Sequence, residues 1–249
     1  MKQVFLSNLI KIKNTSIFRL IFIFPFICVI LSLMFSSLGG KEVLSLTAET
    51  TVNQWGVMWI NVIIAVNSAL LNKLELDSNK YSVYLSRNVN LKKVEYARII
   101  LVAFLNLIIS MILSLILILI GLILPTPSLI SICRMLLTIL LIWLTTLWQI
   151  PFILWLSRKT NLYFAMIINT ISPLIIGTSF SLLDTWYLFP YDWSLKLLEP
   201  MTKMRINGIP IGSEYIPDYS MIFVSFFLGI TFFILLVELS AISFKRQVK

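Results

Sequence analysis

Apolar residues gather into six stretches along the chain, and polar or charged residues separate them. Each stretch is long enough to cross the hydrocarbon core of a membrane as a helix. The second stretch is the weakest because several asparagine, glutamine and serine side chains interrupt it. The pattern predicts an all-α integral membrane protein, a single domain over 1–249, whose six transmembrane helices lie at 17–38, 52–71, 97–124, 129–156, 162–183 and 220–244.

The segments outside these stretches carry their own patterns. Residues 1–16 place Phe5, Leu9 and Ile12 at helical spacing with lysines between them, which predicts an amphipathic helix on the membrane surface. A short basic tail is the alternative. A cleaved signal peptide is the alternative for 17–38, but that stretch is longer than a typical signal core. The Pro-Thr-Pro run at 125–127 stops two helices and predicts a tight hairpin.

Composition supports lipid as the solvent for much of the chain. Of the 249 residues, 59% are apolar and 12% charged, with a mean hydropathy of +0.95. A soluble domain carries about twice that charged fraction. The sequence contains no histidine, which excludes histidine-based triads, zinc sites and proton relays. Its two cysteines, Cys28 and Cys133, are expected to be small buried hydrophobes.

The formal net charge of +9 has a topological explanation. Lysine and arginine collect on the cytoplasmic side of membrane proteins. With six spans, 15 of the 20 basic residues fall in the two terminal segments and the connections after spans two and four, or at the span edges that border them. The distribution predicts that both termini are cytoplasmic, and it argues against a nucleic-acid-binding surface, since the charges spread along one membrane face.

Enzymatic chemistry finds little support in the sequence. Gly40 and Lys41 resemble the end of a phosphate-binding loop, but Phe35 and Glu42 replace the glycine and Ser/Thr that such a loop needs. Glu238 is the one acid that the predicted spans place deep in a helix, and Arg134 lies near the outer end of span four. We expect both to act as anchors or packing partners. The chain is therefore predicted to be non-catalytic, with no directly bound cofactor and no metal.

Neutral polar residues recur on defined faces of the predicted spans. Two interpretations are open. Hydrogen bonds between helices would stabilise the bundle by about 0.6–2 kcal/mol each, and this is the favoured interpretation. The alternative is a polar surface along which a substrate moves. The candidates for such a path are Asn61, Ser68, Asn106, Ser110, Thr145, Gln149 and Asn169, and a helix break is expected at Pro173.

The connection 72–95 is the largest predicted cytoplasmic segment, and it favours a short amphipathic helix. Glu75 and Asp77 would suit the N-terminus of that helix. Such a helix would fit a groove on a cytoplasmic protein, whereas a helix resting on anionic lipid is the alternative. The docking candidates are Glu75, Lys80, Tyr81, Tyr84, Leu85 and Arg87.

The connection 184–219 before span six is too long for a passive linker. Its aromatic residues predict short helices in the outer membrane interface, where they would cap a pore or contact a membrane-bound peptide. The candidates for this contact are Trp186, Tyr191 and Trp193. The two predicted outer loops carry 7 acidic and 4 basic residues, an excess that would attract a cationic peptide, although outer loops are commonly acidic for topological reasons alone.

Together, the amphipathic start, six spans, Glu-led loop 75–98 and outer stretch 186–212, WYLFPYDWSLKLLEPMTKMRINGIPIG, resemble the permease subunits of type-2 ABC exporters. The chain is most similar to those that protect lantibiotic-producing bacteria from their own peptide. The resemblance implies a multi-pass protein of the bacterial cell membrane that expels a cationic bacteriocin. It also implies separate cytoplasmic ATPase chains, which bind ATP and Mg, and a second permease or a homodimer mate. The alternatives are export of another amphipathic substrate, such as a toxic peptide, drug or lipid, and a membrane scaffold or sensor.

Overall fold

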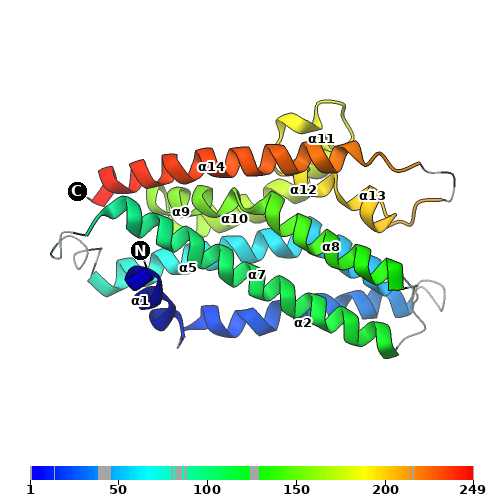
Figure 1. The fold of residues 1–249 in the computed structure, drawn as a ribbon, viewed down its shortest axis with the longest axis horizontal. Helices are drawn as coiled ribbons and strands as arrows, with labels where there is room; N and C mark the ends of the chain where they lie inside the picture. Colours follow the sequence, from blue (N-terminus) through cyan, green and yellow to red (C-terminus); the bar gives the residue numbers. More distant parts are fainter. Residues whose placement is uncertain are drawn as a thin grey trace.

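The computed structural model describes residues 2–13, 15–38, 46–79, 81, 86, 89–123, 129–212, 214 and 216–248. The chain is 84% helical, as the sequence predicts. Among the described residues, β-pairing is limited to an isolated bridge between Met204 and Pro210. The long helices run side by side along the long axis of the molecule, and both described ends of the chain lie at the same end of this bundle (Figure 1).

Within the described ranges, five helices are long and apolar enough to cross a membrane, and a bent pair supplies a sixth if it forms one span. The prediction of several membrane-spanning helices is confirmed at this level. In chain order they are α2 (Ser16–Leu38), the run of α4 (Thr47–Gln54), η1 (Trp55–Trp59) and α5 (Ile60–Asn79), α7 (Leu91–Ile123), the bent pair α8 (Leu129–Thr146) and α9 (Gln149–Lys159), the run of α10 (Leu162–Ser172), η2 (Pro173–Gly177) and α11 (Thr178–Phe180), and α14 (Ser220–Val248).

The second span is longer than predicted, and this changes the role of two acids. The predicted span 52–71 lies inside a helical run that begins at Thr47 and ends at Asn79. Residues 72–79 contain no glycine or proline, so nothing in them stops the helix. Glu75 and Asp77 consequently lie near the C-terminal end of α5, and the prediction that they begin a new helix is wrong. The predicted hairpin at 125–127 lies outside the described residues.

Proline positions explain the irregularities of two spans. The chain bends by 41° between the two halves of the α8–α9 pair. Pro151 follows the bend, lacks an amide hydrogen and would clash with the carbonyl four residues before it, at Leu147. Pro173 does not break its helix as predicted. It begins the π-helical turn η2, through which the helix continues to Phe180.

The connection 184–219, which the sequence predicts to be external and which is called the outer connection below, folds inward onto the bend between α8 and α9. It forms three short helices, η3 (Trp186–Leu188), α12 (Asp192–Leu195) and α13 (Leu198–Thr202). A Cβ on Gly56 would lie 2.9 Å from Leu198 Cδ2, and a Cβ on Gly229 would lie 3.0 Å from Thr145 Cα. These glycines therefore let α13 approach η1 closely and let α14 approach the backbone of α8.

The N-terminal helix α1 (Lys2–Ile12) packs on α7, where the Phe5 and Phe104 rings meet edge to face at 6.2 Å. Ile12 is buried, as an amphipathic helix requires, whereas Leu9 faces outward. Cys28 is buried as predicted, but Cys133 is exposed on α8, so the prediction that it is buried is wrong.

Candidate functional site

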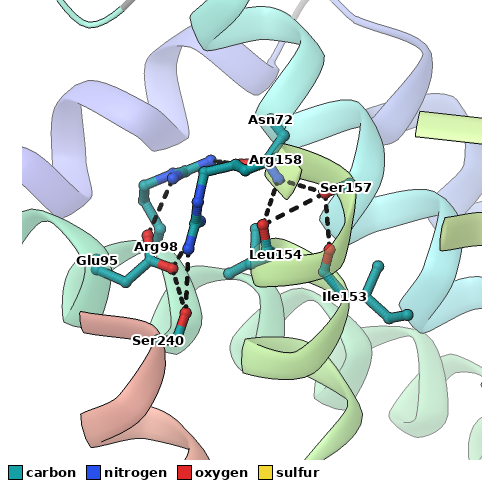
Figure 2. Close-up of polar contacts among 8 residues, drawn as sticks. All are labelled: Asn72, Glu95, Arg98, Ile153, Leu154, Ser157, Arg158 and Ser240. Atoms are coloured by element: carbon teal, nitrogen blue, oxygen red, sulfur yellow. Dashed lines mark hydrogen bonds and ion pairs between the residues drawn. The ribbon is translucent and has the colours of Figure 1, made fainter. Parts of the chain in front are cut away.

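A buried ionic cluster joins four helices at the end of the bundle that holds the termini (Figures 1 and 2). Its centre is Glu95 on α7, which is fully buried. The Glu95 carboxylate accepts a hydrogen bond of 3.0 Å from Arg98 on the same helix and one of 2.8 Å from Arg158 on α9. The Ser240 hydroxyl, on α14, donates to Glu95 at 2.6 Å.

The cluster extends to α5 through Asn72. The Arg98 guanidinium donates to the side-chain oxygen of Asn72, whose amide nitrogen donates to the Leu154 carbonyl at 2.8 Å and to the Ser157 hydroxyl. Figure 2 shows these residues converging from α5, α7, α9 and α14. Charges this deeply buried are tolerated because each has opposite charge and hydrogen-bonding partners around it.

Aromatic rings line one side of the cluster. The guanidinium carbons of Arg98 and Arg158 lie 5.4 Å and 5.0 Å from the centre of the Phe244 ring, near the end of α14. Tyr81 meets Phe244 edge to face at 5.3 Å, and burial raises the pKa of its phenol. Cation–π attraction strengthens in such desolvated surroundings, so the rings support the two arginines. Through Tyr81, the connection before α7 is in contact with the cluster.

The structure places two of the six docking candidates inside the protein. Glu75 forms an ion pair of 2.9 Å with Lys11 of α1, and its side chain is 4% exposed. Tyr81 is 8% exposed. In this arrangement neither presents its side chain to an outside partner, because each packs within the chain. Lys80, Tyr84, Leu85 and Arg87 lie outside the described residues.

A second polar network crosses the middle of the bundle. Gln149 donates to the Asn61 side chain at 2.7 Å and accepts from Asn169 at 2.9 Å. Tyr191 of the outer connection donates to Asn169 at 2.9 Å. The network therefore joins α5, α9 and α10 to the outer connection, and each of its members is buried.

The other path candidates do not join this network. Asn106 accepts from Asn67 at 2.7 Å, which links α7 to α5. Thr145 donates to the Leu141 carbonyl of its own helix. The hydroxyls of Ser68 and Ser110 are buried without a hydrogen-bond partner in the described part of the chain. In this conformation all seven candidates are buried inside the helical bundle. Their role as a substrate path stays a prediction.

The aromatic candidates of the outer connection are buried, contrary to the expected exposed position at the membrane interface. Trp186, Tyr191 and Trp193 are 5–8% exposed and pack with Trp148 at the bend between α8 and α9. The Tyr191 and Trp148 ring centres are 4.9 Å apart. The apolar surface around Trp148, against which these rings are buried, was not predicted from the sequence. They fix the outer connection to the bundle and are not available to a membrane-bound peptide.

Asp192 is an unusual acid in this outer connection. Its side chain is fully buried, and neither carboxylate oxygen has a hydrogen-bond partner among the described residues. A Cβ on Gly177 would lie 3.1 Å from Asp192 Oδ1, so the carboxyl group fits against a helix that has no side chain at that point. Burial raises the pKa of Asp192 from 3.8 to about 7, and Lys196 opposes the rise.

Two further charged residues were singled out in the sequence. Arg134 donates to the Ser131 hydroxyl at 3.4 Å, and that hydroxyl donates to Glu49 at 2.9 Å. Glu238 is 55% exposed, accepts from Tyr96 at 2.7 Å and lies 3.8 Å from Lys92. Both are tied to neighbours near a helix end, which suits the anchoring role expected of them.

Sequence reasoning missed the two most buried acids, Glu95 and Asp192. Glu95 was assigned to a loop because the third span was predicted to begin at residue 97, whereas α7 begins at Leu91. The available signal was the i, i+3 spacing of Glu95 and Arg98 together with Val94 and Ala97, which continue the apolar face. Nothing in the local sequence indicates that Asp192 lacks partners.

The described residues contain no group of three or more cysteine, aspartate or glutamate side chains that could hold a metal ion. The ionic cluster offers a carboxylate whose partners are two guanidinium groups and a serine hydroxyl. Its chemistry suits holding helices together and releasing them when they move. Comparisons with protein-family models, curated proteins and solved structures find no match for the chain.

Proposed function

We propose that this chain is the membrane-spanning subunit of an ATP-driven exporter of the type-2 ABC class, and that it expels a lantibiotic or similar bacteriocin peptide from the bacterial cell membrane. One observation carries the proposal. The ionic cluster, both ends of the chain and the two helix ends that border the connection 72–95 gather at one end of the bundle (Figure 1). A motor that moved this connection would act directly on four spans.

The topology we propose has six spans, with the bent α8–α9 pair crossing the membrane once and both termini in the cytoplasm. The distribution of charge supports this orientation through the preference of lysine and arginine for the cytoplasmic side. The basic residues on the proposed cytoplasmic side are Lys2, Lys11, Lys13, Arg19, Lys73, Lys80, Arg87, Lys92, Lys93, Arg98, Arg158, Lys159, Lys245, Arg246 and Lys249.

Energy in this proposal comes from separate ATPase chains, which bind ATP and Mg, and a second permease or a copy of this chain completes the translocation unit. We assign the direct docking contact to Lys80, Tyr84, Leu85 and Arg87. In this proposal Glu75 and Tyr81 do not contact the ATPase themselves. They pack against other elements of this chain and transmit movement of the docking segment to them. Movement of the docking segment reaches the Arg98 guanidinium, which lies 5.7 Å from the Tyr81 ring centre.

The proposed cargo is a cationic amphipathic peptide. The acidic excess of the proposed outer loops supports this choice, because opposite charge raises the local concentration of a ligand. Because Trp186, Tyr191 and Trp193 are buried, we assign peptide contact to exposed residues of the outer connection. Examples are Tyr187, Leu188 and Ile209.

The test uses cells that carry this chain together with the neighbouring genes. We expect them to survive purified cationic lantibiotics at concentrations that kill cells without the chain. Replacing Tyr84 and Leu85 with aspartate is expected to abolish the protection, while the matched pair Thr160→Asp and Asn161→Asp, exposed in the connection between α9 and α10, tests whether any added charge does the same. Full protection by the Tyr84/Leu85 variant would overturn the docking assignment. Protection against drugs or lipids instead of peptides would point to another substrate, and no protection at all to a scaffold or sensor.

A further inference from the structure

A groove of about 620 Å³ lies at the end of the bundle opposite the termini, between the last turns of α2, η1 and the turn at 206–208. Its volume falls within the usual range for pockets that hold small ligands or parts of larger ones. Apolar side chains form most of its wall, among them Leu31, Phe35, Met58 and Trp59. The groove therefore suits a ligand with an apolar surface.

The polar residues of the groove retain unused hydrogen-bonding atoms. The Ser36 hydroxyl is buried without a partner in the described part of the chain. Asn53 uses its amide nitrogen on the Arg205 carbonyl, and within the described residues no hydrogen bond uses its side-chain oxygen. The side-chain oxygen of Gln54 accepts from the Ser32 hydroxyl, and that of Asn207 accepts from the Ile209 backbone amide. The described contacts leave the side-chain amide nitrogens of Gln54 and Asn207 unused.

These groups form a neutral set that contains both donors and acceptors, and no charged side chain lines the groove. A lipid phosphate selects lysine or arginine, which the lining lacks. A bare acyl chain would leave a polar atom without a partner on each of the four side chains Ser36, Asn53, Gln54 and Asn207. The backbone of a peptide offers what the set lacks, because every residue carries one amide donor and one carbonyl acceptor.

We infer that this groove binds an uncharged segment of an amphipathic peptide, with the apolar side chains against Leu31, Phe35, Met58 and Trp59 and the peptide backbone against Ser36, Asn53, Gln54 and Asn207. The inference deepens the exporter proposal and rests on it for the peptide being cargo. Binding itself requires no ATPase, so the two claims are tested separately.

The first experiment uses the unaltered chain, purified in detergent, and two fluorescent probes. One is a capped, uncharged peptide of alternating leucine and serine. The other has the same side chains, with alternate backbone nitrogens methylated, which removes donors and keeps the apolar surface. We expect the methylated probe to bind at least tenfold more weakly, a difference of about 1.4 kcal/mol. Equal affinities would overturn backbone recognition.

The second experiment uses variants with matched controls. Gln54→Leu is expected to weaken the unmethylated probe about fivefold to tenfold, whereas Gln3→Leu, on the exposed side of α1, leaves its affinity unchanged. Met58→Trp is expected to fill the groove and reduce binding about tenfold, whereas Met111→Trp, on the exposed face of α7, has no effect. Unchanged binding in both groove variants would overturn the inference.

A lipid competitor separates the remaining sources of binding. Lauroyl lysophosphatidylcholine is expected to displace the unmethylated probe only weakly. Displacement at concentrations comparable to the peptide's own affinity would assign the groove to lipid and overturn the peptide inference. If the peptide binds as expected but no ATPase accompanies the chain, the exporter proposal fails and the groove assignment stands. If an ATPase accompanies the chain and the probes do not bind, the groove assignment fails and the exporter proposal stands.

Discussion

Two regions of the molecule, the ionic cluster and the outer connection, each bury an acid, but in opposite surroundings. At the end with the termini, Glu95 is fully buried, but two guanidinium groups and a hydroxyl surround it. In the outer connection, Asp192 is just as buried, and its carboxylate oxygens have no partner among the described residues. The first acid is stabilised in its charged form and the second in its neutral form.

The contrast suggests that the ionic cluster and the neutral polar regions have different roles. An ionic cluster that joins four helices holds firmly in one arrangement and loses much of its energy when a member moves away, which suits an element that transmits a push. A neutral region with unused amides and hydroxyls has hydrogen bonds left for a ligand.

The largest effect is expected for Glu95→Gln. The substitution keeps the shape of the side chain but leaves Arg98 and Arg158 without the carboxylate they share. Removing one partner from a buried ion pair typically costs about 3–5 kcal/mol. We expect a corresponding loss of unfolding free energy when the detergent-purified protein is titrated with a denaturing detergent. A loss below about 1 kcal/mol would mean that the cluster does not hold the helices.

A smaller loss is expected for Gln149→Leu in the middle of the bundle. The substitution removes the hydrogen bonds to Asn61 and Asn169 and leaves their amides buried. Hydrogen bonds between membrane helices contribute modestly, so we expect about 1–2 kcal/mol from the same titration. Loss of export with unchanged stability would instead favour the path interpretation of these residues.

Asp192→Asn is expected to change how stability depends on pH. With a pKa of about 7 in the folded protein and 3.8 as its ordinary value, Asp192 holds a proton in the folded state that the unfolded state has released. Stability therefore falls as pH rises between about 4 and 7. Asparagine cannot ionise, so the variant should lack this fall. At pH 8 its unfolding temperature should exceed that of the parent by several degrees. Identical pH profiles for the two proteins would contradict the buried neutral carboxyl.

The smallest effect is expected for Glu238→Gln, which applies the chemistry of Glu95→Gln at an exposed site near the same end. Glu238 is 55% exposed and lies 3.8 Å from Lys92, a distance and exposure at which ion pairs contribute little. We expect a change below about 0.5 kcal/mol. A loss equal to that of Glu95→Gln would show that burial is not what separates the two acids.

Hydropathy alone predicted the helical class and the approximate positions of the long helices, because the requirement for apolar surface in lipid acts on each span separately. It was less successful at helix ends. A stretch of polar residues such as NKLELD reads as a loop by hydropathy, yet it has good helix formers and no breaker, so α5 continues through it.

The sites were harder to predict because they depend on contacts between distant segments. Glu95 and Ser240 are 145 residues apart, and no local pattern relates them. The aromatic residues of the outer connection were predicted to lie at a membrane interface because their own sequence is amphipathic. They pack instead on Trp148, at the bend between α8 and α9. The asparagines and Gln149 were recognised as polar positions in apolar spans, but only the fold shows which of them meet.

The most direct test of the account is the identity of the chains that accompany this one out of its native membrane. The protein, tagged at its C-terminus, is extracted in mild detergent and its partners are identified and quantified by mass spectrometry. We expect a nucleotide-binding ATPase in stoichiometric amount, lost when Tyr84 and Leu85 are replaced by aspartate and retained in the Thr160/Asn161 control. Recovery of the intact, folded chain without any ATPase, or ATP hydrolysis by the isolated chain, would contradict it.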